Sequence, residues 1–150
     1  MSAITHATMV LERTYKAAPA RVFAAWESVE AREQWAAPND NVRVRYTEAD
    51  FREGGLDVTA CVESDGKTFD TRNFYLSIER ETRIVFTEQI FQEGFQLSAA
   101  IVSVEFEAAG AGTRQLVTLQ IASFVGDDMV HGYDQGWTAA LDQLAKQVET

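Results

Sequence analysis

Hydrophobic side chains near the C-terminus recur at the spacing of an α-helix. Each follows the previous one by three or four residues, which places all of them on one face of a 3.6-residue period. The members of this set are Tyr133, Trp137, Leu141, Leu144 and Val148. Asp127 and Asp128 stand where acidic groups favour a helix N-terminus, and Lys146 stands near the opposite end. The pattern predicts one long amphipathic helix over residues 126–150.

The chain before this helix alternates apolar and polar residues in short runs, which is the pattern of β-strands. The predicted strands cover residues 8–15, 42–47, 56–63, 68–78, 83–90, 100–107 and 114–123. Residues 19–27 and 29–35 are predicted to be short helices, with Pro19 in the first turn of one and Ser28 as the N-cap of the other. Because the later strands are joined by short turns, we expect an antiparallel sheet.

This order of elements predicts an α+β fold. A curved antiparallel sheet of about six to seven strands would wrap around the long C-terminal helix, and two short helices would follow the first strand. No internal repeat, low-complexity tract or linker divides the 150 residues. We therefore expect a single domain over residues 1–150, with any functional site in the space between sheet and helix.

The composition narrows the classes of function. The formal net charge of −10 argues against nucleic acid or an anionic membrane as a partner. No apolar run is long enough for a transmembrane span, and the N-terminus has no signal-peptide pattern. Cys61, the only cysteine, fits a reducing cytoplasm. His6 and His131 are far apart, and neither metal-ligand spacing nor a phosphate-binding loop is present, so we expect no metal site and no cofactor.

Several strings spread over almost the whole chain resemble those of one known family. They are PARVFAAW at 19–26 with Trp35 downstream, FREGG at 51–55, FYLSI at 74–78, RIVFT at 83–87, GTR at 112–114 and GW at 136–137. Together they are similar to the activator-of-heat-shock-protein-90-ATPase-like branch of the START-related (SRPBCC, Bet v1-like) superfamily. The resemblance implies the helix-grip fold, in which a curved antiparallel sheet grips the C-terminal helix around a cavity. Functions within this family are diverse, so it implies the fold more than an activity.

The strand registers predict which side chains line that cavity. Asp65-Gly66 is a strong hairpin signal, and a two-residue turn there sets the pairing of its two strands. The facing pairs on one side of the sheet would be Asp57 with Phe74, Thr59 with Arg72 and Cys61 with Asp70. Pairing of Ile78 with Ile84 across the next turn would place Leu76 opposite Phe86 and Phe74 opposite Glu88. This face is apolar at one end, where it would meet the helix, and polar at the other.

An inward-facing charge is costly unless it is paired, so this register predicts that Arg72 contacts Asp57, Glu88 or both. A bulge or a longer loop at 64–67 would slip the register instead. The set then facing inward would be Leu56, Val58, Ala60 and Val62, which is uniformly apolar. Both registers are consistent with the sequence.

Three functions follow as hypotheses. The first is binding of a small hydrophobic, aromatic or lipid-like ligand. The candidate ligand-binding residues are Trp35, Thr59, Cys61, Arg72, Phe74, Phe86, Met129, Tyr133 and Trp137. The second is a cofactor-free cyclase, dehydratase or hydrolase, with Asp57 or Glu88 as general base and Arg72 or Tyr133 stabilising an oxyanion. The third, which follows from the family resemblance alone, is regulation of a chaperone ATPase. An open sheet edge also permits a homodimer.

Overall fold

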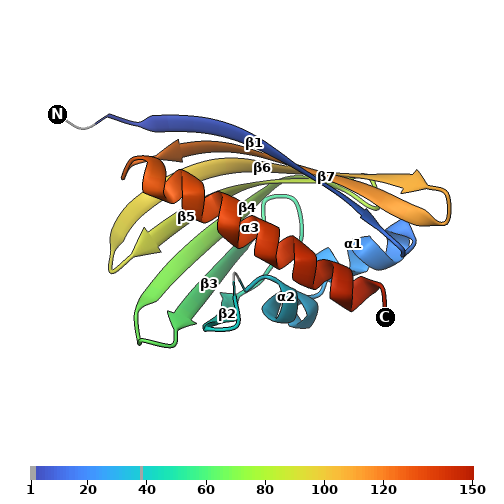
Figure 1. The fold of residues 1–150 in the computed structure, drawn as a ribbon, viewed down its shortest axis with the longest axis horizontal. Helices are drawn as coiled ribbons and strands as arrows, with labels where there is room; N and C mark the ends of the chain where they lie inside the picture. Colours follow the sequence, from blue (N-terminus) through green and yellow to red (C-terminus); the bar gives the residue numbers. More distant parts are fainter. Residues whose placement is uncertain (1–2, 38) are drawn as a thin grey trace.

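One curved antiparallel sheet covers one side of a long helix. The computed structural model describes residues 3–37 and 39–150. The strands are β1 (Thr5–Tyr15), β2 (Val42–Glu48), β3 (Leu56–Glu63), β4 (Thr68–Glu79), β5 (Arg83–Gln92), β6 (Phe95–Ala109) and β7 (Gly112–Ser123). The helices are α1 (Pro19–Glu27), α2 (Val29–Trp35) and α3 (Asp127–Val148). The sheet order is β1-β7-β6-β5-β4-β3-β2, and α3 crosses its hollow side (Figure 1). The predicted α+β helix-grip architecture is confirmed.

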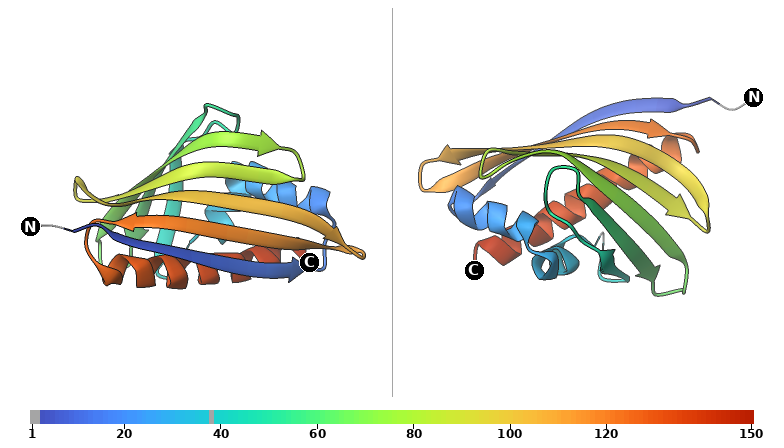
Figure 2. Two further views of the ribbon diagram at one scale, coloured as in Figure 1. Left: turned by 90° about the horizontal axis from the view of Figure 1, so that it is seen from above. Right: turned by 180° about the vertical axis from the view of Figure 1, so that it is seen from behind.

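The two short helices close one end of this arrangement. Pro19 occupies the first turn of α1, where its missing N–H is not needed. Ser28 caps α2, because its hydroxyl accepts a hydrogen bond from the Ala31 N–H at 3.2 Å, as the sequence predicted. Trp26 of α1 and Trp35 of α2 pack edge to face at 4.7 Å between ring centroids. The helices α1 and α2 lie beside the C-terminal half of α3 and leave its N-terminal half facing the sheet alone (Figure 2).

The core lies between α3 and the central strands. Leu141, Leu144 and Val148 of α3 are buried, as the periodicity predicted. They pack in one cluster with the inward residues of β6 and β7, including Val104 and Leu119. Burial of these aliphatic side chains is the main favourable contribution to the stability of this end of the molecule.

The registers around β4 differ from both sequence-based alternatives. On β3, Asp57, Thr59 and Cys61 face inward as the first alternative predicted, so the inward orientation of Leu56, Val58, Ala60 and Val62 is wrong. On β4, however, Leu56 rather than Asp57 pairs with Phe74. The Glu63 N–H bonds to the Lys67 carbonyl at 2.8 Å, so the turn is longer than two residues. The inward side chains of β4 are therefore Thr71, Asn73 and Tyr75.

A bulge at Leu76 accounts for the rest of the difference. Ile78 pairs with Ile84 as predicted, but Tyr75 rather than Leu76 opposes Phe86, and Asn73 rather than Phe74 opposes Glu88. One extra residue in a strand reverses the facing of every side chain beyond it. The bulge is held from outside the sheet, because Tyr75 exchanges two backbone hydrogen bonds with Gly54 and Gly55, at 2.9 and 3.1 Å.

Arg72 and Phe74 consequently lie on the outer face of the sheet. The Arg72 side chain is exposed and its guanidinium lies 5.0 Å from the Phe91 ring centroid, while Phe74 is 42% exposed. Their predicted inward orientation is wrong, and so is the predicted contact of Arg72 with Asp57 or Glu88. Glu88 itself faces inward as predicted.

Candidate functional site

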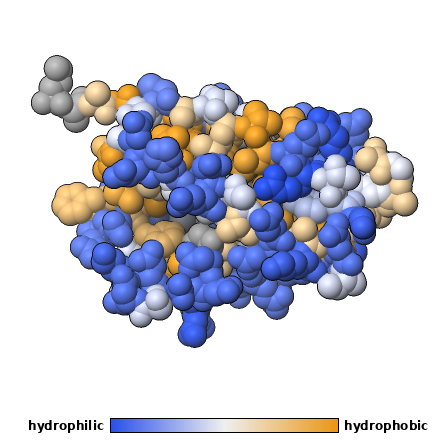
Figure 3. All heavy atoms as spheres, in the orientation of Figure 1, coloured by the Kyte–Doolittle hydropathy of each residue, from blue (hydrophilic) through white to orange (hydrophobic). Residues whose placement is uncertain are grey.

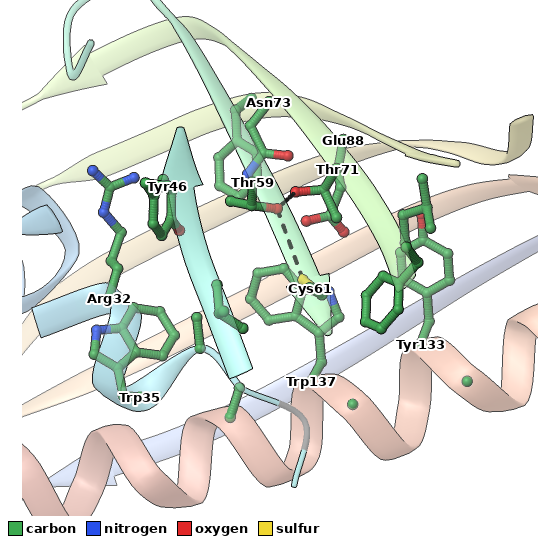
Figure 4. Close-up of a pocket in the computed structure, with 18 of the residues that line it drawn as sticks. Arg32, Trp35, Tyr46, Thr59, Cys61, Thr71, Asn73, Glu88, Tyr133 and Trp137 are labelled. Carbon is green, nitrogen blue, oxygen red and sulfur yellow. Dashed lines mark hydrogen bonds between the residues drawn. The ribbon is translucent and has the colours of Figure 1, made fainter. Parts of the chain in front are cut away.

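A cavity of about 440 Å³ separates the sheet from the N-terminal half of α3. The inward side chains of β2, β3, β4 and β5 form its roof, α3 forms its floor, and Trp26 and α2 close one end (Figure 4). In the space-filling view, hydrophilic side chains cover most of the face on which α3 lies, and apolar atoms are seen between them (Figure 3). The cavity is a concave space with both aromatic and polar walls, which is typical of small-molecule sites.

The aromatic wall is built around Trp137 of α3. Its ring stacks on Trp26 with centroids 6.2 Å apart and an interplanar angle of 23°. Phe86 of β5 lies 6.5 Å from it on the sheet side. Trp35 extends the wall through its contact with Trp26, and Met129 lines the far end. These positions follow from the helical period of α3 and the alternation of β5.

The polar wall lies on the sheet. The Thr59 and Thr71 hydroxyls share a hydrogen bond, and Thr59 also lies 3.9 Å from the Cys61 sulfur (Figure 4). Asn73 and Glu88, paired across β4 and β5, complete this wall. The Asn73 side-chain oxygen is buried without a hydrogen-bond partner. Such an atom is costly to bury and is available to a bound molecule.

Glu88 is the carboxyl group in the cavity with the most altered acidity. Its side chain is 9% exposed, and burial raises its pKa from 4.5 to about 7, an effect that a hydrogen bond from Trp137 partly offsets. A carboxyl group with a pKa near neutrality is present in both protonation states at physiological pH. Strongly perturbed groups of this kind concentrate at functional sites.

An ion pair closes the end of the cavity near α2. Arg32 donates through Nη1 to Asp57 and, at 2.9 Å, to the Tyr75 hydroxyl, which in turn donates to Asp57. The Asp50 N–H donates to the second Asp57 oxygen at 2.9 Å. Arg32 also lies over the Tyr46 ring, 4.6 Å from its centroid. Arg32 thus neutralises the buried Asp57 carboxylate, the role that the sequence analysis assigned to Arg72.

The cavity contains most, but not all, of the residues that the sequence singled out. Those on its lining are Trp35, Thr59, Cys61, Phe86, Glu88, Met129, Tyr133 and Trp137. Arg72 and Phe74 are outside it, and Asp57 lies behind the lining in the ion pair with Arg32. The lining residues that sequence reasoning missed include Arg32, Tyr46, Thr71, Asn73 and Tyr75. Arg32 had one detectable signal, since it precedes Trp35 by three residues and so shares its helical face.

Cys61 and Tyr133 are both protonated at neutral pH. Burial raises the pKa of the Cys61 thiol to about 11, although its contact with Thr59 acts in the opposite direction. The thiolate is the reactive form of cysteine, so Cys61 behaves as a small buried side chain. Burial also raises the pKa of Tyr133, whose hydroxyl lies 2.9 Å from Ser98 Oγ.

Neither a metal cluster nor a membrane-spanning helix is found in the described part of the chain. No group of three His, Cys, Asp or Glu side chains among residues 3–37 and 39–150 could hold a metal ion. Within the same residues, no helix is long and apolar enough to cross a membrane. The cavity between the sheet and α3 is the candidate functional site.

Comparison with known proteins decides the family. The family model described as "Activator of Hsp90 ATPase homolog 1-like protein" matches residues 16–149. The chain belongs to this family. Its members share the START-like fold that the sequence resemblance implied, and this fold is generally one that binds small ligands. A search of curated proteins gives no match.

Several solved structures superpose closely on this chain. A protein from Rhizobium loti is 30% identical, with a TM-score of 0.86 over 96% of this chain and 98% of its own. A protein from Rhizobium leguminosarum is 32% identical, with a TM-score of 0.86 over 99% of this chain and 98% of its own. An AHSA1 protein from Silicibacter pomeroyi is 21% identical, with a TM-score of 0.76 over 94% of this chain and 96% of its own, and shows the fold alone.

Proposed function

We propose that this protein binds a small organic molecule with an aromatic or otherwise apolar body in the cavity between the sheet and α3. The observation that carries the proposal is a cavity of about 440 Å³ in which the stacked rings of Trp26 and Trp137 face a wall of buried polar groups. An apolar body would cover the rings, and one or two polar atoms would satisfy groups such as Asn73 Oδ1.

A purely structural role explains some of the buried polar groups around the cavity but not Glu88 and Asn73. The charges of Arg32 and Asp57 compensate one another and Tyr75 bonds to both, which fits a structural role, although Arg32 Nε and Nη2 have no partner. Glu88 and Asn73 have no comparable ion pair, although both are largely desolvated at the cavity wall. A buried polar group without a partner is usually explained by water, an ion or a ligand.

Filling the cavity from β4 tests the proposal. Thr71→Phe places a ring in the cavity, whereas Arg72→Phe places the same ring on the opposite face of the same strand. We expect aromatic and acyl compounds found by thermal-shift screening to stabilise the wild type and Arg72→Phe. A ligand at 100 times its Kd stabilises by about 2.7 kcal/mol, which raises the melting temperature of a domain of this size by about 5 to 10 °C.

The same ligands should leave Thr71→Phe unshifted although the variant stays folded by circular dichroism. Native mass spectrometry of purified wild-type protein, before any compound is added, would show a co-purifying ligand directly. Equal stabilisation of the two Phe variants would place binding outside the cavity and contradict the proposal.

A second candidate function is catalysis by Glu88. The observation in its favour is that a carboxyl group with a pKa of about 7 lines an open cavity, as a general base requires. Arg72 cannot assist it because it lies outside the cavity, so Tyr133 remains as the candidate hydroxyl donor. Exchange of the α-hydrogens of a bound ketone into deuterated water, measured by NMR and lost in Glu88→Gln, would favour this function over binding alone.

A further inference from the structure

We infer that the cavity is selective for the charge of its ligand and takes a molecule whose apolar body carries a protonated amine that pairs with the Glu88 carboxylate. This inference rests on the proposed binding function and adds the chemical class of the ligand.

Among residues 3–37 and 39–150, no cation lies next to Glu88. The groups facing it come from α3 (Tyr133 and Trp137), β2 (Tyr46), β3 (Cys61), β4 (Asn73) and β6 (Ala100). Tyr133, Tyr46 and Cys61 are acids that burial keeps neutral, and Trp137 contributes a single N–H. Ionised Glu88 is thus a buried charge whose counter-charge the described chain does not supply. A ligand cation would supply it.

Arg32 is the only cation among the described residues of the cavity lining, and it is already neutralised. Its Nη1 bonds to Asp57, and its Nε and Nη2 atoms are buried and unbonded. In Figure 4 the Tyr46 and Thr59 side chains lie between Arg32 and Glu88, and among the described residues no salt bridge joins these two charges. The charge of Arg32 is therefore compensated by Asp57, and an anionic group beside Glu88 would meet a second negative charge. The unbonded Arg32 N–H groups can still donate to a neutral acceptor atom on another part of the ligand.

Two neighbouring features favour an ammonium group in particular. Asn73 stands directly opposite Glu88 on β4, and its buried oxygen is a second acceptor without a partner. An ammonium group has three N–H donors and can serve both acceptors at once. The rings of Trp137 and Phe86, which lie 6.5 Å apart beside Glu88 on the cavity wall, attract a cation through their faces.

The acidity of Glu88 makes the selectivity depend on pH. Its pKa of about 7 means that it is mostly protonated at pH 6 and mostly ionised at pH 8. An amine binds the ionised form, and primary alkyl amines such as that of lysine stay protonated at both values. Amine affinity should therefore rise by about tenfold between pH 6 and pH 8, because the ionised fraction of a carboxyl group with this pKa rises by about tenfold over that interval. Binding of an uncharged ligand should change far less.

Three probes with one body and different charges test the inference. They are 3-phenylpropylamine, 3-phenylpropanol and 3-phenylpropionate, titrated by isothermal calorimetry up to millimolar concentration at pH 6 and pH 8. The variants are Glu88→Gln and, as a control with the same change of net charge, Glu105→Gln on the exposed side of β6. At pH 8 we expect the wild type and Glu105→Gln to bind the amine about tenfold more tightly than the alcohol, as charge-assisted hydrogen bonds are roughly twice as strong as neutral ones. The carboxylate should bind most weakly.

Glu88→Gln should bind the alcohol within about threefold of the wild type and lose both the preference for the amine and its pH dependence. Retained alcohol binding shows that the variant is folded. If the alcohol binds the wild type but the amine binds no better, or if Glu88→Gln keeps the preference, the inference is overturned while the proposed binding function stands. If none of the three probes binds, the proposed function fails and the inference fails with it.

Discussion

Glu88 and Arg32 are both buried charged residues, but only Arg32 has a partner of opposite charge. Arg32 and Asp57 neutralise one another through direct hydrogen bonds. Glu88 receives no such partner, and burial raises its pKa. Because a paired charge contributes to the fold and an unpaired charge opposes it, the two residues make opposite predictions for stability.

Glu88→Gln should stabilise the unliganded protein, and the gain should grow with pH. The folded-state pKa of about 7 lies above the ordinary value of 4.5. Stability linked to Glu88 is therefore fully present below pH 4.5, falls as the pH rises between these values, and is lost above about pH 7. A shift of this size corresponds to about 3 kcal/mol. Urea unfolding of wild type and variant at pH 5 and pH 8 measures the difference, and a gain that does not increase with pH would contradict the prediction.

Arg32→Met should destabilise the protein far more than Arg72→Met. The first variant leaves Asp57, which is fully buried, without its cation, and such a loss costs about 3 to 5 kcal/mol. The second removes an exposed side chain from the outer face of β4, where substitutions usually change stability by about 0.5 kcal/mol. Urea unfolding with equal m-values for the three proteins gives the comparison. Equal losses for the two variants would show that the Arg32–Asp57 pair does not support the fold.

At the scale of single elements, α3 divides into two halves with different roles. Leu141, Leu144 and Val148 in the C-terminal half are fully or almost fully buried in the core. Met129, Tyr133 and Trp137 in the N-terminal half line the cavity. The same amphipathic face thus supports the fold at one end and the site at the other.

Leu141→Ala and Met129→Ala test whether the C-terminal half of α3 contributes mainly to stability and the N-terminal half mainly to ligand affinity. Leu141→Ala opens a void in a packed core and should cost about 2 to 5 kcal/mol. Met129 is half-buried at the cavity wall, so Met129→Ala should cost less than half as much and should change ligand affinity instead. Thermal unfolding followed by ligand titration of both variants makes the comparison. A larger loss of stability for Met129→Ala would mean that the N-terminal half also serves as core.

The bulge at Leu76 is the element-scale feature that decides the composition of the site. Together with the longer turn between β3 and β4, it directs Thr71, Asn73 and Tyr75 into the cavity and leaves Arg72 and Phe74 outside. The loop at 51–55 holds the bulge through Gly54 and Gly55. A side chain at Gly55 would place its Cβ 2.0 Å from the Asp50 carbonyl oxygen, so this close approach requires glycine. Phe51 in the same loop packs against Tyr75 at 5.0 Å between centroids.

At the scale of the whole molecule, the cavity exists because the sheet curves while α3 is straight. The sheet meets α3 closely at β1 and β7, and aliphatic side chains of β6 and β7 fill the core there. Toward β2 and β3 the strands turn away from α3, as the view from behind shows (Figure 2). The side chains there are shorter and more polar, including Thr59, Cys61 and Thr71, and they leave the space open.

The amino-acid sequence by itself determined the elements and most of their facing. The 3.6-residue period identified α3 and its buried face, and Pro19 and Ser28 marked the short helices. The alternation of β3 defined two possible inward sets, of which the structure has Asp57, Thr59 and Cys61. These features depend on neighbours within a few residues, so local patterns record them. Glu88 and the aromatic lining of α3 followed from the same patterns.

The tertiary structure alone decided the register of β4 and the partner of Asp57. The bulge at Leu76 depends on hydrogen bonds from a loop about 20 residues away, and a single such residue reverses the facing of a strand. Arg32 reaches Asp57 only because α2 packs against the open end of the sheet. No short-range pattern encodes either contact. The charge balance of the cavity, with Arg32 neutralised and Glu88 left unpaired, therefore became visible only once the chain was folded.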